Sequence, residues 1–127
     1  MDADNQRLNH ITRKVIGAAM KVSNTLGSGF LEKVYENALV HELRKTDVRV
    51  APQHPIPVSY DGVVVGGYAA DLLVDDAVLV ELKAVKAFDE VRMAQCMNYL
   101  KATGLRVCLL LNFGHPRLQV KRIVRNF

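Results

Sequence analysis

Asp71, Glu81 and Lys83 are the residues of this chain whose types and spacing could do chemistry together. Asp71 lies in one apolar run, Glu81 and Lys83 lie in the next, and acidic residues 75 and 76 separate the two. Two short runs rich in valine and leucine around a polar turn predict a β-hairpin. Because side chains alternate between the faces of a strand, Glu81 and Lys83 share one face, and the opposite face is apolar.

The register of this hairpin decides whether the two acids meet. If the loop consists of residues 75–77, Asp71 stands opposite Glu81, and their Cβ atoms lie roughly 5 Å apart. If the loop is one residue shorter, Asp71 stands opposite Val80, and the two acids point to opposite faces of the sheet. We expect the longer loop, with the pairs 71/81, 72/80, 73/79 and 74/78, because only this register forms a site.

Opposed carboxylates at this distance repel each other, and a proton or a divalent cation must relieve the repulsion. Mg²⁺ prefers oxygen ligands, retains several waters and activates one of them for attack on a phosphodiester, and Mn²⁺ is its usual substitute. Asp71 and Glu81 are therefore candidate metal ligands, and Lys83 is a candidate to orient the water or the phosphate. The alternative is an exposed hairpin face on which Glu81 and Lys83 form a salt bridge.

The spacing of Asp71, Glu81 and Lys83 resembles the core motif of the PD-(D/E)XK nuclease superfamily. The chain departs from that motif at one position, because Ala70 stands where a proline usually precedes the aspartate. The resemblance continues through several further segments and covers nearly the whole chain.

Two flanking motifs make the resemblance more specific. Gln95 and Tyr99 reproduce the Gln-x-x-x-Tyr signature of RecB-like members, and they share one face of a predicted helix. Gly29, Glu32 and Tyr35 match the Gly-x-x-Glu-x-x-Tyr signature of a small bacterial family, GxxExxY, within the superfamily. The chain is thus similar to that family in both its core and its flanks.

The resemblance implies an enzyme that hydrolyses phosphodiester bonds of DNA with Mg²⁺ or Mn²⁺. It implies that Asp71 and Glu81 ligate the metal and Lys83 positions water and phosphate. It also implies that Glu32 completes the acid cluster, with support from Gln95 and Tyr99. RNA is a second possible substrate, and a homodimer or protein partner would supply specificity that so small a domain lacks. The alternative function is a non-catalytic module of the same fold that binds nucleic acid or a protein.

The helix-borne residues also have structural interpretations. Glu32 could reach back to the helix start as a capping-box acid, and Tyr35 is expected to be a core ring with a satisfied hydroxyl. Gln95 could hold a water or phosphate, whereas Tyr99 could stack on a base or simply pack.

The elements that must position these residues form one predicted α/β domain spanning residues 1–127, a mixed central sheet flanked by helices. A length of 127 residues with 50% hydrophobic and 24% charged residues suits a single core. Helical periodicity predicts helices over 8–26, about 30–45 and about 88–103, with Leu31 and Val34 in the apolar stripe of the second. Besides the hairpin, we expect an irregular or edge strand over 49–60 and strands over 107–111 and 119–125.

Charge is compatible with nucleic acid. The net charge is +4, and residues 101–127 contain six cations and no acid: Lys101, Arg106, Arg117, Lys121, Arg122 and Arg125. A basic edge of this kind would attract a phosphate backbone without reading sequence, although a solvated edge strand would have the same composition.

Other classes of site lack support in the sequence. Cys96 and Cys108 are expected to be reduced core thiols, and the four histidines have no ligand spacing. No Gly-rich phosphate loop ending in Lys-Ser or Lys-Thr occurs, and no apolar run approaches the ~18 residues that span a membrane. A cytoplasmic location is the expectation.

Overall fold

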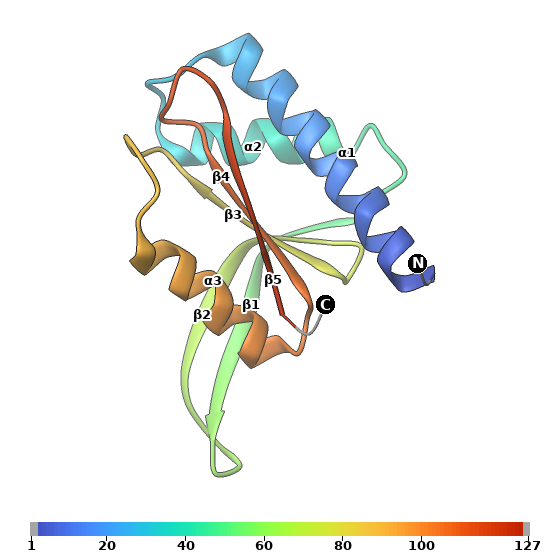
Figure 1. The fold of residues 1–127 in the computed structure, drawn as a ribbon, viewed down its shortest axis with the longest axis vertical. Coiled ribbons are helices and arrows are strands. Elements are labelled where there is room, and N and C mark those ends of the chain that lie inside the picture. Colours follow the sequence, from blue (N-terminus) through green and yellow to red (C-terminus); the bar gives the residue numbers. More distant parts are fainter. Residues whose placement is uncertain (1–2, 126–127) are drawn as a thin grey trace.

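The computed structural model describes residues 3–125, which form three helices and five strands (Figure 1). In chain order these are α1 (Ala3–Leu26), α2 (Glu32–Leu43), β1 (Val50–Tyr60), β2 (Val63–Val74), β3 (Val78–Lys83), α3 (Glu90–Thr103), β4 (Val107–Asn112) and β5 (Gln119–Val124). The strands make one sheet in the order β1-β2-β3-β4-β5, parallel between β3 and β4 and antiparallel elsewhere. The predicted mixed sheet with flanking helices is confirmed.

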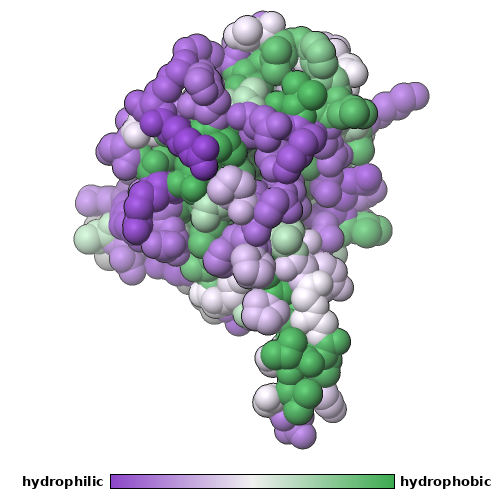
Figure 2. All heavy atoms as spheres, turned by 180° about the vertical axis from the view of Figure 1, so that it is seen from behind, coloured by the Kyte–Doolittle hydropathy of each residue, from purple (hydrophilic) through white to green (hydrophobic). Residues whose placement is uncertain are grey.

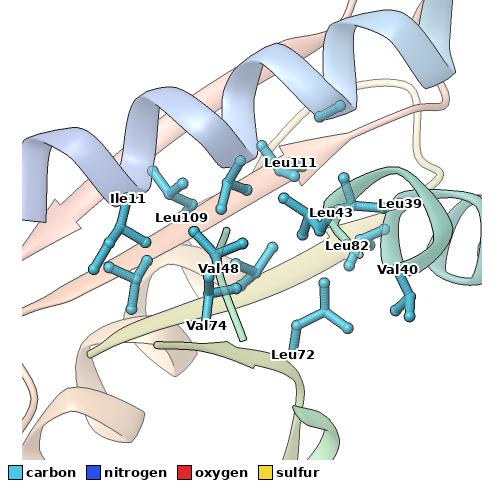
Figure 3. Packing of buried hydrophobic residues seen from close by; sticks show 14 of the residues in the cluster. Ile11, Leu39, Val40, Leu43, Val48, Leu72, Val74, Leu82, Leu109 and Leu111 are labelled. Atoms are coloured by element: carbon cyan, nitrogen blue, oxygen red, sulfur yellow. The ribbon is translucent and has the colours of Figure 1, made fainter. Parts of the chain in front are cut away.

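Two apolar clusters attach the helices to opposite faces of the sheet. Helices α1 and α2 pack on one face, where the strand residues Leu82, Leu109 and Leu111 point toward the helices (Figure 3). Helix α3 packs on the other face through Cys96, Tyr99 and Leu100, against residues such as Leu79 and Leu110 of β3 and β4. The sheet is therefore a buried middle layer, as strands with apolar residues on both faces require.

Helix α1 ends where the sequence predicts, because Gly27 adopts a positive φ of 71° and its N–H donates to the Ser23 carbonyl. Helix α2 is shorter than predicted, and its stripe was wrong in part. Leu31 is 79% exposed and precedes the helix, and Val34 is also exposed. The first buried residue of α2 is Tyr35, so the buried face is shifted by one residue relative to the predicted stripe at Val34.

The hairpin between β2 and β3 has the predicted register. Leu72, Leu73 and Val74 pair with Val80, Leu79 and Val78, and residues 75–77 form the loop. Asp75 and Asp76 are turn residues, with φ angles of 52° and 54°. Asp75 Oδ1 also accepts the backbone N–H of Arg49, which explains an acid at this position.

The ladder between β2 and β3 stops at Leu72 and Val80, and beyond this point the two strands separate. β2 continues beside β1 as a two-stranded arm that projects from the body of the molecule (Figure 1). A tight turn at Asp61 and Gly62, with φ angles of 54° and 76°, closes the arm. Strand β1 forms the edge of the sheet, as its three prolines predict.

The arm is unusually apolar for an exposed structure. Figure 2 shows hydrophobic side chains gathered over its projecting end, where Tyr60, Val63, Val64 and Val65 are all exposed. No lysine or arginine occurs between residues 50 and 74 of the sequence. The arm therefore lacks the lysine and arginine side chains with which basic loops bind a phosphate backbone.

Residues 3–125 also include the two cysteines and the cations of the expected basic edge. Cys96 and Cys108 are buried free thiols, as predicted, and a hydrogen bond with Cys96, followed by burial, raises the pKa of Cys108. None of the described helices combines the length and apolar character needed to cross a membrane. Lys121 and Arg122 are exposed on edge strand β5, whereas Arg106 reaches back to Asn5, with 2.8 Å between Nη2 and Oδ1. The basic edge thus includes fewer outward-facing cations than the sequence indicated.

Candidate functional site

The point where β2 and β3 separate brings Asp71 and Glu81 together. The Asp71 backbone N–H donates to Glu81 Oε1 at 2.8 Å, and the Leu82 N–H donates to Asp71 Oδ2 at 2.8 Å. Each carboxylate thus accepts an amide proton that a regular ladder would have directed to a carbonyl. The acids meet, as the register predicts, and they also hold the split of the sheet in place.

Burial makes this pair of carboxylates costly. Glu81 is only 3% exposed, and burial, followed by the charge of Asp71, raises its pKa to about 7. Burial likewise raises the pKa of Asp71, and the bond from Leu82 partly opposes that shift. The interpretation of an exposed, salt-bridged hairpin face is therefore wrong, because Glu81 lies inside the molecule.

Lys83 lies at the end of β3 on the face that bears Glu81, and it is partly exposed. Its positive charge lowers the pKa of both Asp71 and Glu81, so the ammonium lies near both carboxylates. Within residues 3–125 it forms no ion pair as short as 4.0 Å with either of them. Lys83 is therefore close to the two carboxylates but does not form a direct ion pair with them.

Glu32 joins the site from the first turn of α2. Its Oε2 accepts the backbone N–H of Ala84 at 3.2 Å, and its charge raises the pKa of Glu81. Leu31 is the N-cap of α2, and no side chain caps that end, so the capping-box interpretation is wrong. The acid instead spans from the helix to the residue that follows β3.

Tyr35 fixes the approach to α2, and through it the position of Glu32. Its hydroxyl donates to the Gly27 carbonyl at 2.6 Å and accepts the Phe30 N–H at 3.1 Å. Its ring stacks on Phe113 with centroids 4.7 Å apart. The predicted core ring with a satisfied hydroxyl is confirmed.

Two residues that the sequence did not single out extend the acid cluster. Glu36 is buried on α2, where Lys33 Nζ lies 2.6 Å from Oε2 and Gln53 Nε2 donates to Oε1 at 2.9 Å. The charge of Glu36 raises the pKa of Asp71, and a hydrogen bond from Gln53 lowers it. One helical turn separates Glu36 from Glu32, and this spacing was the available signal.

Gln53 stands in β1 opposite Asp71, between the pairs formed by Pro52 and His54. Its φ is 52°, a left-handed conformation that is uncommon for a residue with a side chain. This backbone turn places a neutral amide between Glu36 and Asp71. The sequence near Gln53, in a proline-rich edge strand, gives no indication that this residue contacts the acids.

Tyr99 and Gln95 lie on α3, and the structure brings Tyr99 but not Gln95 close to the acids. Tyr99 is 5% exposed, and burial, followed by Glu81 and Asp71, raises its pKa to about 12. Gln95, one turn earlier, lines a groove of about 640 Å³ between α3 and the arm. Tyr99 is thus beside the acids but too buried to stack on a base, and Gln95 faces the neighbouring groove.

The donor set is suited to a hard cation, although it is not assembled around one. Asp71, Glu81, Glu32 and Glu36 offer only carboxylate oxygens, which Mg²⁺ and Mn²⁺ prefer. Within residues 3–125, however, no three Asp, Glu, His or Cys side chains are placed to hold one ion together. The bonds to the amides of residues 71, 82 and 84 direct one oxygen of three of these acids toward backbone.

Comparisons with known proteins agree with this geometry. Residues 9–123 match a family model described as the PD-(D/E)XK nuclease superfamily. The fold is similar to an alkaline exonuclease from Laribacter hongkongensis, with a TM-score of 0.51, 15% identity, and coverage of 85% of this chain and 76% of that one. It is also similar to the structure of SSO0001, with a TM-score of 0.53, 14% identity, and coverage of 75% and 51%. A comparison with curated protein sequences finds no significant match.

Proposed function

Because this chain belongs to the PD-(D/E)XK nuclease superfamily, we propose that it is a divalent-metal-dependent nuclease that hydrolyses phosphodiester bonds of DNA. The observation that carries the proposal is the meeting of the Asp71 and Glu81 carboxylates at the split, with Lys83 beside them. We include in the proposal membership of the GxxExxY family, on the motif of Gly29, Glu32 and Tyr35. A non-catalytic protein with the same fold would gain nothing from keeping two buried carboxylates that repel each other.

Asp71 and Glu81 would hold the cation, and the charge of Glu32, which contributes to the raised pKa of Glu81, would add to the negative charge around it. The cation, Mg²⁺ or Mn²⁺, supplies a Lewis acid for the phosphate oxygens and makes a water more acidic. Its charge would also offset the burial and the repulsion by Asp71 that raise the pKa of Glu81.

The chain's own groups perform the remaining tasks. Lys83 would bind a phosphate oxygen and orient the attacking water, because a partly exposed ammonium beside the acids can donate to both. Glu32 would remain anchored to the Ala84 amide and keep α2 against the end of β3. Gln95 would position the substrate from the groove, and Tyr99 would exclude water from the Glu81 side.

The test is cleavage of a panel of single-stranded, double-stranded and branched DNA, and of RNA, with Mg²⁺ or Mn²⁺. We expect nicking or degradation of DNA that a chelator stops. Lys83→Ala should abolish cleavage and preserve metal affinity, because lysine does not ligate the cation. Lys45→Ala is the matched control, because Lys45 pairs with Glu42 at the far end of α2 and should leave cleavage unchanged.

A second candidate is a non-catalytic module that binds nucleic acid or a protein partner. It is favoured by the backbone bonds of Asp71 and Glu81, which give both acids a structural role, and by the absence of three grouped acids within residues 3–125. Metal binding without cleavage of any substrate in the panel would support this candidate. Cleavage that appears only when a protein partner is added would contradict this candidate and assign the activity to a complex.

A further inference from the structure

The groove between α3 and the β1–β2 arm lies beside Tyr99, and the roles assigned above use Gln95 of its walls but give no role to its arm side. It has a volume of about 640 Å³, with Val58 and Tyr68 on the arm side and Val91, Gln95 and Asn98 on the helix side. Small-molecule and base sites fall in this size range.

Tyr68 is the residue that gives the groove a stacking surface. It is 55% exposed, and its ring lies against the buried ring of Tyr99, with centroids 5.6 Å apart and planes inclined by 49°. Tyr99 thus supports the Tyr68 ring from behind, and the remaining surface of that ring is open to the groove. An aromatic ring held in this way can stack on any nucleobase, because every base has a π-face.

The other walls suit a base attached to a phosphate. Gln95 and Asn98 carry neutral amides, which donate to and accept from the edges of bases. Lys101 is the charged residue among the described residues that line the groove, and none of them is acidic. A phosphate-linked ligand therefore meets apolar walls, amides and a positive charge.

The groove adjoins the acids through Tyr99. Tyr99 contributes both to the groove wall and to the surroundings of Glu81 and Asp71, whose charges help to raise its pKa. Tyr68 precedes Asp71 by three residues on the same strand, which corresponds to about 10 Å of extended chain. A nucleotide in the groove would thus be a near neighbour of a phosphate at the acids.

Within the proposed nuclease function, on which this inference rests, we propose that the groove receives an unpaired base of single-stranded DNA, which stacks on Tyr68. A paired base cannot present its face to the ring without leaving the duplex, because both of its faces are stacked on neighbours. The site therefore selects single-stranded regions over intact duplex.

The experiment measures binding of an oligonucleotide that contains one 2-aminopurine, whose fluorescence is quenched by stacking. A chelator is present, so cleavage does not compete and failure of the nuclease function leaves the measurement intact. We expect the wild-type protein to quench the single strand and to bind the corresponding duplex more weakly. Tyr68→Ala should weaken single-strand binding at least about fivefold and remove the quenching, and Tyr68→Phe should preserve both.

Tyr60→Ala is the matched control, because Tyr60 is on the same arm and 75% exposed but does not line the groove. Its binding should equal that of the wild-type protein. The proposal is overturned if Tyr68→Ala binds and quenches normally, if Tyr60→Ala loses as much, or if duplex binds as tightly as single strand. A change in the sedimentation of free protein on Tyr68→Ala would assign the groove to a second copy of the chain instead.

Discussion

The two faces of β3 have opposite compositions and opposite functions. Toward α1 and α2 the strand presents Val78, Val80 and Leu82, all buried in one apolar cluster. Toward α3 it presents Leu79, then Glu81 and finally Lys83, so the face changes from apolar to charged along six residues. One face of a single strand stabilises the fold, and the other holds charges that burial opposes.

The charged face of β3 depends for its support on the apolar face. A carboxylate buried as deeply as Glu81 carries a desolvation penalty, and the packing one residue away must outweigh it. Substitutions on the two faces should therefore change the free energy of unfolding in opposite directions.

The largest effect is expected from Leu82→Ala. Loss of a fully buried leucine leaves a cavity and should reduce the free energy of unfolding by about 2–5 kcal/mol. The neighbouring substitution Glu81→Gln should leave stability unchanged or raise it at pH 8, because glutamine retains an acceptor for the Asp71 amide and removes a buried charge. Urea unfolding of both variants checks this, and a large loss in Glu81→Gln would contradict the contrast between the faces.

The next effect is a pH dependence of stability in metal-free protein. The pKa of Glu81 rises from 4.5 to about 7 on folding, so the folded state retains a proton that the unfolded state has released between these pH values. Stability should therefore fall as pH rises from about 4.5 to 7, by on the order of 3 kcal/mol for this group. The pKa of Glu42 falls to about 2, so its opposite contribution lies below pH 4.5.

Glu81→Gln serves as the control for this pH dependence. The variant lacks the titrating group, so the decline in stability between pH 4.5 and 7 should become shallower. Chemical denaturation at several pH values gives the slope directly, and equal slopes in the two proteins would remove Glu81 as its cause.

The smallest effect distinguishes the two roles of Asp71. Asp71→Asn retains an oxygen that can accept the Leu82 N–H and removes one of two repelling charges, so stability should be unchanged or raised. Asp71→Ala leaves that amide without its acceptor and should be less stable than the asparagine variant by about 1 kcal/mol. A thermal melt of each variant tests this, and equal stability of the two would show that the bond to Leu82 contributes nothing.

The register of the site hairpin could be predicted from the sequence for a clear physical reason. Period-two alternation allows only certain loop lengths to place Asp71 and Glu81 together, and the observed pairing from Val74 and Val78 to Leu72 and Val80 agrees. Edge strand β1 was equally predictable, because prolines exclude an interior position.

The remaining parts of the site depend on long-range contacts that no local pattern records. The separation of the strands arises where side chains of Asp71 and Glu81 replace backbone partners, and Gln53 enters through a positive φ. Glu36 reads as an ordinary polar residue of a helix until α2 is packed against β1 and the sheet. Leu31 precedes helix α2, which begins two residues later than predicted, since local periodicity does not fix that boundary.

Under the proposed function, the charged face of β3 holds a divalent cation through Asp71 and Glu81. Calorimetric titration with Mg²⁺ and with Mn²⁺, at pH 8 where the raised pKa of Glu81 leaves its carboxylate ionised, tests this most directly. We predict binding by the wild-type protein and by Lys83→Ala, and none by Asp71→Asn. Absence of binding to the wild-type protein, or equal binding by Asp71→Asn, would contradict the account.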